Sequence, residues 1–228
     1  RCRRILCEFE AAELELAHRM GAPRGRIRIS VPQAGMLIMP HLAEFQRRHP
    51  EIELDIHSSD RLVDVIEEGF DAVIRIGGSQ DSRLMSRMIG AFRQAVVATP
   101  AYFARMGMPR RPEDLVRHDC LHYRVPTTGK LLPWQLSRDG VAIELDLPVK
   151  MIANTLDPQL RFAAMGLGIA YLPDFAVAQQ LRDGSFVRIF EDYCLDTVPI
   201  HLLWPSSRHL SPRLRALVDF MAEGLIED

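Results

Sequence analysis

The stretch GRIRISVPQAGMLIMPHLAEFQRRHPEIELDIHSSDRLVDVIEEGFDAVIRIG, residues 25–77, decides the fold class of this chain. Residues 26–31 and 52–59 alternate apolar and polar side chains, which is the period of a strand with one buried face. Residues 71–77 form a more continuous apolar run, as in a buried strand. Helical patterns separate the three strands and the connections are short, so the stretch predicts a βαβαβ unit with a right-handed parallel sheet.

Two helices are expected between these strands. The first stops at Pro50, because the residue before a proline disfavours the helical conformation. The second is expected over the stretch RLVDVIEEG, with Asp60 as its N-cap and Gly69 at its C-terminus. The apolar faces consist of Ile38, Leu42 and Phe45 in the first helix and Leu62, Val65 and Ile66 in the second.

A second set of strands and helices starts near Thr99. Within it, the dipeptide Asp139–Gly140 lies between short β-type stretches and predicts a hairpin turn. Further helices with clear end signals follow. Their candidate caps are Thr155 or Asp157, then Asp174, then Ser211 followed by Pro212, and the glycines that would close the first two are Gly166 and Gly184.

Composition and charge are those of an ordinary globular protein. The 228 residues are 47% hydrophobic and 25% charged, and 28 basic against 30 acidic residues give a formal net charge of −2. The chain as a whole therefore has no strong field for nucleic acid or a membrane, and it has no apolar run long enough to span one.

The four cysteines show no CxxC motif and no paired spacing. This favours free thiols in a reducing compartment, and hence a cytoplasmic location, with a disulfide or redox switch as the alternative. The cysteines are Cys2, Cys7, Cys120 and Cys194.

The first 20 residues contain no glycine or proline and carry a helical seam with spacings of 3, 4, 3 and 4. The seam indicates either the end of a coiled coil or a short amphipathic helix packed on its own domain. It consists of Cys2, Ile5, Phe9, Ala12 and Leu16. Because the chain begins with arginine, it is expected to be a fragment of a longer protein.

Ligands of open α/β sheets bind beyond the carboxyl ends of strands, at helix N-termini. In this chain the corresponding loops carry neutral hydrogen-bonding side chains. The loops are residues 32–35, 58–60, 77–79, 99–101, 154–155 and 173–174. Each serine or threonine could simply cap a helix, but together they indicate a binding cleft. Arg75, in an otherwise apolar strand, could donate to a ligand carboxylate or form an internal salt bridge.

Catalytic and metal-binding motifs are not found. The sequence has no GxSxG, HExxH, P-loop or strand-to-helix GxGxxG motif. The stretch GLG at residues 166–168 follows a helix, so it is interpreted as a C-terminal turn. His118 and His122 lie in a loop entering a strand, where their spacing does not place them on one helical face. We therefore expect no metal, no cofactor and no enzymatic activity.

The order of elements resembles the effector-binding domain of LysR-type transcriptional regulators. The resemblance covers residues 25–77 and the stretches DSRLMSRMIG, ATPAYFARMGMPRRPEDLVRHDCLHYR, NTLDPQLRFAAMGLGIAYLPDFAVAQQLRDGSFVRIF and PIHLLWPSSRHLSPRLRALVDFMAEGL. It implies an α/β fold of two Rossmann-like subdomains joined by two crossover strands, similar to type 2 periplasmic binding proteins. The implied divisions are the end of a linker helix at 1–24, subdomain I at 25–98 and 198–228, and subdomain II at 99–197.

The resemblance also implies where an effector binds, between the two subdomains. The implied contacts are Pro32, Gln33, Ala34, Ser58, Ser59, Arg75 and Gly77 from subdomain I, and Pro100, Asn154, Thr155 and Pro173 from subdomain II. Many family members have serine or threonine in the first loop, where this chain has Gln33 and Ala34. The effector is therefore expected to differ from the simple carboxylates those members bind.

The partners implied are a small organic effector, acidic or aromatic, and further copies of the same chain in a homodimer or tetramer. DNA would be contacted only by a winged helix-turn-helix that this chain does not contain, and no membrane is expected. The rival hypotheses are a solute-binding protein of a transport system and an enzyme on the same fold.

Overall fold

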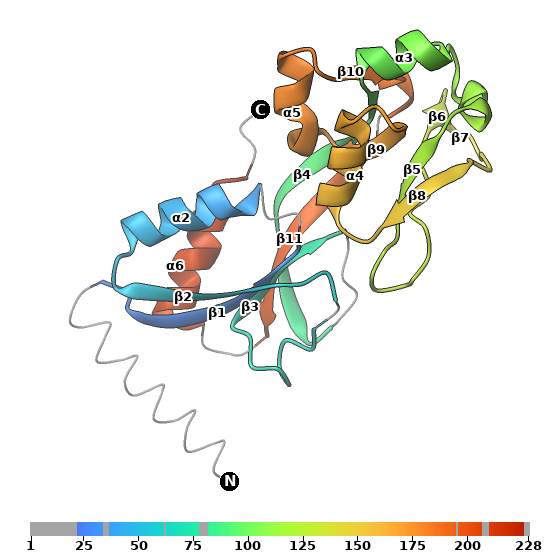
Figure 1. Ribbon diagram of the computed structural model, residues 1–228. Coiled ribbons are helices and arrows are strands. Elements are labelled where there is room, and N and C mark those ends of the chain that lie inside the picture. The colour runs from blue at the N-terminus through green and yellow to red at the C-terminus, as the bar shows by residue number, and fades with distance from the viewer. Residues whose placement is uncertain are drawn as a thin grey trace. The chain divides into compact units, whose positions relative to one another are not determined.

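The computed structural model describes residues 22–33, 37–61, 63–77, 82–194, 196–206 and 210–225. The helical seam predicted over residues 1–20 lies outside the described residues. The chain divides into unit 1, residues 1–90 and 199–228, and unit 2, residues 91–198. It passes from unit 1 to unit 2 within β4 (Leu84–Ala98) and returns within β11 (Thr197–Pro205) (Figure 1). These two crossings confirm the predicted fold class.

Unit 1 contains the predicted parallel sheet. Its strands β1 (Gly25–Val31), β2 (Ile52–Ser58) and β3 (Ala72–Ile76) are arranged with β1 in the middle, parallel to both neighbours. β11 continues the sheet by pairing antiparallel to β3. The helices α2 (Ile38–Arg48) and α6 (Pro212–Met221) contact these strands and each other. The face predicted for the first helix is buried, as expected: Ile38, Leu42 and Phe45.

The second helix predicted in this unit is wrong, because residues 65–69 form turns. Side-chain oxygens accept hydrogen bonds from backbone amides in this stretch. The Asp64 carboxylate accepts from the amides of Ile66 and Glu67, both at 3.0 Å. The Glu68 carboxylate accepts from the Asp64 amide at 3.1 Å. Aspartate competes with a helical ladder in this way, and here the local bonds win over the apolar periodicity.

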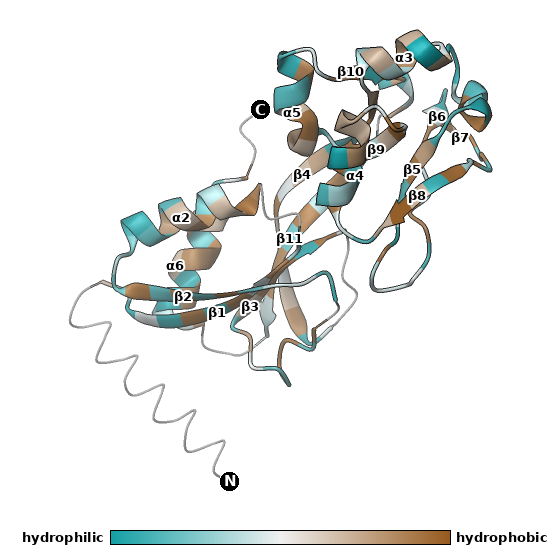
Figure 2. Ribbon diagram, in the orientation of Figure 1, coloured by the Kyte–Doolittle hydropathy of each residue, from teal (hydrophilic) through white to brown (hydrophobic). Residues whose placement is uncertain are grey.

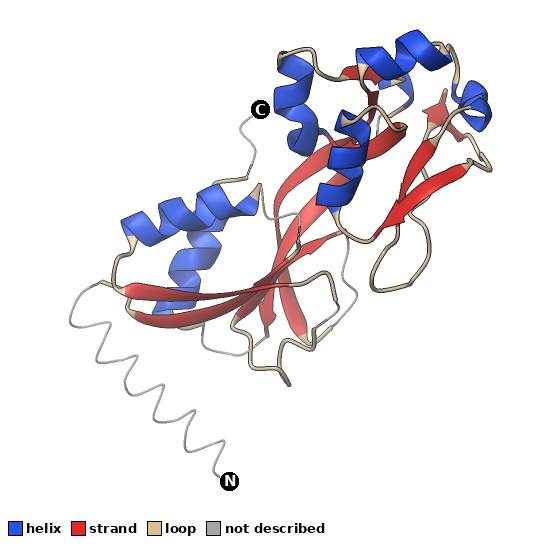
Figure 3. Cartoon of the chain, in the orientation of Figure 1, coloured by secondary structure: helices blue, strands red, loops and turns tan. Residues whose placement is uncertain are grey.

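Unit 2 also has a central sheet. Strands β5 (Cys120–Tyr123), β8 (Val149–Ala153) and β9 (Ile169–Pro173) are parallel, whereas β4 is antiparallel to β9 and to β10 (Val187–Ile189). The helices α4 (Leu156–Ala164) and α5 (Asp174–Arg182) pack on one face of this sheet (Figure 3). Figure 2 shows apolar residues concentrated along the strands, with mixed colouring on the helices.

The other face of this sheet is covered mainly by short elements. They are α3 (Pro100–Met106), the 3₁₀ turns η1 (Pro112–Arg117) and η2 (Glu191–Tyr193), and the irregular segment 124–148. The predicted hairpin turn is confirmed in that segment, where Asp139 and Gly140 connect β6 (Ser137–Arg138) to β7 (Val141–Ala142). Both turn residues have positive φ, 52° and 76°, as a two-residue turn of this kind requires.

The helix ends follow the sequence signals in part. Ser211 accepts a hydrogen bond from the Leu214 amide at 3.3 Å and Pro212 is the first helical residue, as predicted. Thr155 stands at the N-cap position of α4 but its side chain makes no capping bond. The cap predicted at Asp174 is wrong: α5 begins at this residue, and its carboxylate accepts from the Arg93 amide of β4 at 3.3 Å.

The glycines of the GLG stretch have two different structural roles. Gly166 has φ 70° and its amide bonds to the Ala163 carbonyl, which confirms the C-terminal turn. Gly168 lies so close to strand β5 that an added Cβ would be 2.6 Å from the Asp119 carbonyl oxygen. Only a residue without a side chain fits at that position.

We therefore expect Gly168→Ala to lower the free energy of unfolding by about 2–3 kcal/mol, the cost of forcing an extra carbon into packed backbone. The matched control is Gly184→Ala, where an added Cβ meets nothing within 4 Å and only the φ of +75° is unfavourable. Its expected cost is about 1 kcal/mol. Chemical denaturation measures both, and equal losses would contradict the steric role of Gly168.

Candidate functional site

The parallel pairing of β1, β2 and β3 brings their carboxyl ends to one edge of the unit 1 sheet. We call this region the unit 1 edge. The predicted site residues that lie there are Pro32, Gln33, Ser58, Ser59, Arg75 and Gly77. The remaining residue predicted for the loop after β1, Ala34, lies outside the described residues. The structure therefore brings the predicted unit 1 residues together on neighbouring loops.

Hydrogen bonds between the loops fix the unit 1 edge. The Ser59 amide donates to the Val31 carbonyl at 2.9 Å, which ties the end of β2 to the end of β1. The Gln33 amide donates to the Asp60 carboxylate at 2.8 Å. Asp60 therefore holds the loop after β1, in place of the helix cap predicted for it. The exposed Gln33 side chain is left facing solvent at this edge.

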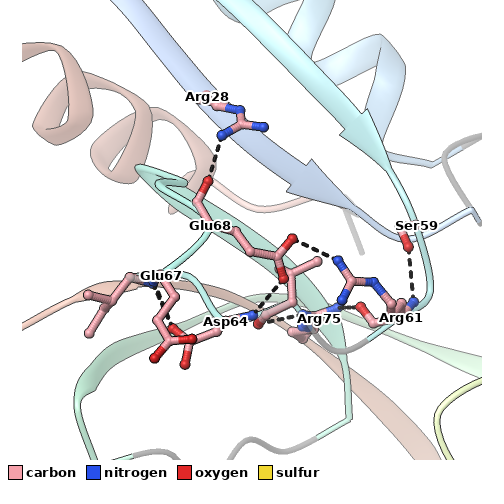
Figure 4. Close-up of polar contacts among 9 residues, drawn as sticks. Arg28, Ser59, Arg61, Asp64, Glu67, Glu68 and Arg75 are labelled. Carbon is pink, nitrogen blue, oxygen red and sulfur yellow. Dashed lines mark hydrogen bonds and ion pairs between the residues drawn. The ribbon is translucent and has the colours of Figure 1, made fainter.

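Among the described residues, Arg75 bonds to backbone carbonyls and not to a carboxylate. Its guanidinium donates to the Arg61 carbonyl at 2.9 Å and approaches the Val63 carbonyl at 3.5 Å (Figure 4). Burial lowers the pKa of Arg75, and the charges of Asp60 and Glu68 oppose that effect. Within the described part of the chain, bonds to the turn segment 61–70 take the place of the internal salt bridge considered for Arg75. A guanidinium carries more N–H donors than these two bonds use.

The turn segment 61–70 is also held from β1. Arg28 donates to the Glu68 carbonyl at 2.6 Å and lies over the Phe70 ring at 4.6 Å. Within the segment, Arg61 pairs with the Glu68 carboxylate at 2.7 Å, and the Ser59 hydroxyl accepts from the Arg61 amide at 3.1 Å (Figure 4). The loop that carries Ser59 is therefore positioned by charged side chains from the strands beneath it.

The charge of Asp64 supports this segment. The hydrogen bond from the Glu67 amide, followed by Arg83 and the Ile66 amide, lowers the pKa of Asp64 below its usual value. A carboxylate whose pKa is lower in the folded state stabilises that state above its unfolded pKa, about 4, and the contribution disappears as the pH falls through the folded pKa.

We expect Asp64→Asn to unfold more easily than the unchanged chain at neutral pH, with the difference shrinking as the pH falls below about 4. Thermal unfolding across that pH range measures it. The matched control is Asp192→Asn, which removes an exposed carboxylate of η2 in unit 2. A difference that persists or grows at low pH would contradict the role assigned to the ionised Asp64.

His201 is a neighbour of the unit 1 edge that the sequence analysis did not single out. It lies opposite Arg75 in the β11–β3 pairing, and its Nδ1 is 3.0 Å from the Gly77 carbonyl. Since a carbonyl only accepts, Nδ1 is the donor and Nε2 is the second polar atom of the ring. In the sequence, His201 is marked only by its place in an otherwise apolar strand, VPIHLLWP. That pattern does not predict the pairing of β11 with β3 that places it opposite Arg75.

In unit 2 the parallel strands β5, β8 and β9 also end at one edge of their sheet. Asn154, Thr155 and Pro173 lie there, directly after β8 and at the end of β9, and we call this region the unit 2 edge. Pro100 does not join them. It follows β4, which is antiparallel to β9 with Val97 opposite Ala170, so β4 ends beside the start of β9.

Gln159 is a second residue that the sequence analysis did not single out. It lies on α4, is 1% exposed, and donates through Nε2 to the Leu121 carbonyl at 2.9 Å. Its Oε1 has no hydrogen-bond partner in the described part of the chain. A glutamine on the buried side of the helix that follows Thr155 was the signal available in the sequence.

His118 and His122, the two histidines considered for a metal pair, each have a structural partner. His118 Nδ1 is 3.3 Å from the Tyr102 hydroxyl, whereas His122 Nε2 is 3.1 Å from the Pro148 carbonyl. Across the described ranges, no group of three or more His, Cys, Asp or Glu side chains could hold a metal ion. Burial raises the pKa of the Cys120 thiol to about 12 and that of Cys194 to about 11, which disfavours the reactive thiolate.

The chain forms two compact units that are connected through two strands, β4 and β11. Each unit has helix N-termini and polar loops at one edge of its sheet. These features define a ligand-binding domain of the two-lobed α/β class. The family model described as LysR substrate binding domain matches residues 20–226. The chain therefore belongs to the LysR substrate-binding domain family, and it is the effector-binding domain of a LysR-type regulator.

Curated relatives support this assignment over most of the chain. An HTH-type transcriptional regulator of Haemophilus influenzae is 32% identical over 212 residues, covering 92% of this chain and 73% of the relative. The HTH-type transcriptional regulator PgrR of Escherichia coli is 29% identical over 218 residues, covering 94% of this chain and 73% of the relative. The relatives are transcriptional regulators rather than enzymes or transport proteins.

Solved structures agree with the fold. The full-length Vibrio cholerae virulence activator AphB has a TM-score of 0.80 and 27% identity, covering 99% of this chain and 77% of that chain. The regulatory domain of CrgA from Neisseria meningitidis has a TM-score of 0.78 and 26% identity, covering 88% of this chain and 98% of that chain. No helix among the described residues is long and apolar enough to cross a membrane.

Proposed function

We propose that this domain senses a small organic molecule, acidic or aromatic, through the unit 1 edge and the unit 2 edge. The observation that carries the proposal is Arg75, a half-buried guanidinium at the carboxyl end of β3 whose bonds go to backbone carbonyls and not to a carboxylate of the described residues. Such a group has donors left for an anionic ligand. Pro100 is not included, because it lies at the opposite end of β9.

The polar neighbours of Arg75 suit the recognition of a small acid or aromatic acid. Ser58 ends β2 and Ser59 follows it, beside the loop of Gln33. In unit 2, the Thr155 hydroxyl makes no capping bond, so it is available at the start of α4 together with Asn154. Hydroxyl and amide groups orient a ligand, while the guanidinium selects its charge.

Effector binding acts by shifting populations. A ligand that binds one conformation of the domain more tightly favours that conformation, and the change alters how subunits of a homodimer or tetramer present their DNA-binding domains. DNA is contacted by a winged helix-turn-helix outside this chain, as the names of the HTH-type relatives suggest. Such a regulator works in the cytoplasm and turns over no substrate.

The test is thermal unfolding of the domain with a panel of small carboxylic acids and aromatic compounds. A ligand at 100 times its dissociation constant adds about 2.7 kcal/mol to the free energy of unfolding. We expect at least one acid to stabilise the domain, and Arg75→Gln to weaken its binding by about tenfold or more, the loss of a charge-assisted hydrogen bond. Arg75→Lys retains the charge and should recover part of the affinity.

The matched control is Arg47→Gln, which removes an exposed guanidinium paired with Glu44 on α2. Hydrogen exchange of residues 61–70 shows whether Arg75→Gln loosens the turn segment, and Ser59→Ala tests the edge without touching Arg75. The proposal fails if no acid or aromatic compound binds, or if the hit binds Arg75→Gln and Ser59→Ala as tightly as the unchanged domain.

A further inference from the structure

Unit 2 contains a cavity of about 610 Å³ that is lined by none of the residues named for either edge. All of its lining residues lie between His122 and Asp196, within unit 2. None of them is a residue predicted for effector binding. Its volume lies within the range of small-molecule sites, about 300–1,000 Å³. We refer to it as the unit 2 cavity.

Most of the cavity lining comes from the segment 131–147, which covers the sheet with short β-type pairings. Only a few backbone bonds fix this segment, among them Leu132 N to Tyr123 O at 2.8 Å and Ile143 N to Leu136 O at 2.8 Å. Apolar side chains do the remaining anchoring, since Leu145 and Leu147 pack against the buried core of this face. A segment held at a few points leaves space between its turns that the core does not fill.

One wall of the cavity is aromatic and rigid. Trp134, 8% exposed, stacks on Tyr171 with ring centroids 5.5 Å apart and planes at 18°. His122 lies beside the indole at 6.0 Å and is fixed by the Pro148 carbonyl. Leucines and a valine supply much of the remaining lining. This wall suits the flat apolar body of a ligand.

The charged groups of the lining are all acidic. Glu144, Asp146 and Asp196 contribute to it, and the lining contains no lysine or arginine. Within the described ranges, none of these three carboxylates forms an ion pair or accepts a hydrogen bond. A cavity with one sign of charge and apolar walls concentrates ligands of the opposite charge and disfavours those of the same charge.

We propose that the unit 2 cavity binds a primary amine with an apolar, aromatic body, with the ring against the Trp134 wall and the ammonium group at the carboxylates. This is a second site, separate from the proposed effector site and opposite to it in charge preference. It gives the domain a way to respond to a cationic molecule independently of an anionic effector.

The fluorescence of Trp134 can report binding in the cavity. The chain has two tryptophans, Trp134 in the cavity wall and Trp204 in unit 1. In a Trp204→Phe background, emission from Trp134 alone follows occupancy. The probes are phenethylamine, the matched acid 3-phenylpropionate and the neutral 2-phenylethanol, which do not absorb where indole is excited. We expect a saturable change with phenethylamine and binding at least about tenfold weaker for the acid.

Charge variants test the carboxylates. Asp196→Asn and Glu144→Gln should each weaken phenethylamine binding by about two- to fivefold, the effect of one solvent-exposed ion pair, and the double variant by more. The control Asp192→Asn removes an exposed carboxylate of η2 outside the lining and should change nothing. Circular dichroism and thermal unfolding establish that each variant is folded before it is titrated.

Three results would overturn the proposal. They are no saturable change in Trp134 emission with phenethylamine, equal binding of the amine, the acid and the alcohol, and equal loss in Asp192→Asn and Asp196→Asn. A further check is independent of charge: Ala142→Phe places a ring at the lining and should abolish the amine response while leaving acid-induced stabilisation through Arg75 intact. Failure here therefore leaves the proposed effector site untouched, and the reverse also holds.

Discussion

Parallel pairing is the constraint on which the functional geometry depends. β1, β2 and β3 run in one direction, so the loops after them meet at one edge, and Gln33, Ser59 and Arg75 become neighbours although 42 positions separate the first from the last. The same rule gathers Asn154 and Pro173 in unit 2. β4 runs antiparallel to β9, so Pro100, which follows β4, lies at the opposite end of β9 from that edge.

Guanidinium groups then set the detailed shape of the unit 1 edge. Arg28 from β1 and Arg75 from β3 both donate to carbonyls of the turn segment 61–70, one near each end. These bonds hold the segment in its turn conformation, and the carboxylates of Asp64 and Glu68 accept from backbone amides within it. The segment is thus shaped by polar contacts from the sheet below it, and Ser59 is placed by the same contacts.

Much of the fold could be predicted from the sequence because period, caps and turns are local signals. Alternation gave β1 and β2, helical spacing gave α2, and Asp139–Gly140 gave the hairpin turn. The errors arose where distant groups decide local structure. The helix expected after Asp60 is replaced by turns that arginines from β1 and β3 hold together with the local bonds of Asp64 and Glu68, and Asp174 bonds to the Arg93 amide of β4. The position of His201 depends on the pairing of β11 with β3, and the unit 2 cavity depends on incomplete packing. Neither can be predicted from a local sequence pattern.

The positions of the two units along the chain determine which of them can fold first during synthesis. Unit 2 is one continuous stretch, residues 91–198, inserted into unit 1, which is completed only by residues 199–228. On the ribosome, all residues of unit 2 emerge before β11 and α6 exist, so unit 2 can fold while unit 1 still lacks a central strand. Until then the first part of unit 1 leaves β3 without its β11 neighbour, an open strand edge on the nascent chain that a chaperone or a second nascent copy could occupy.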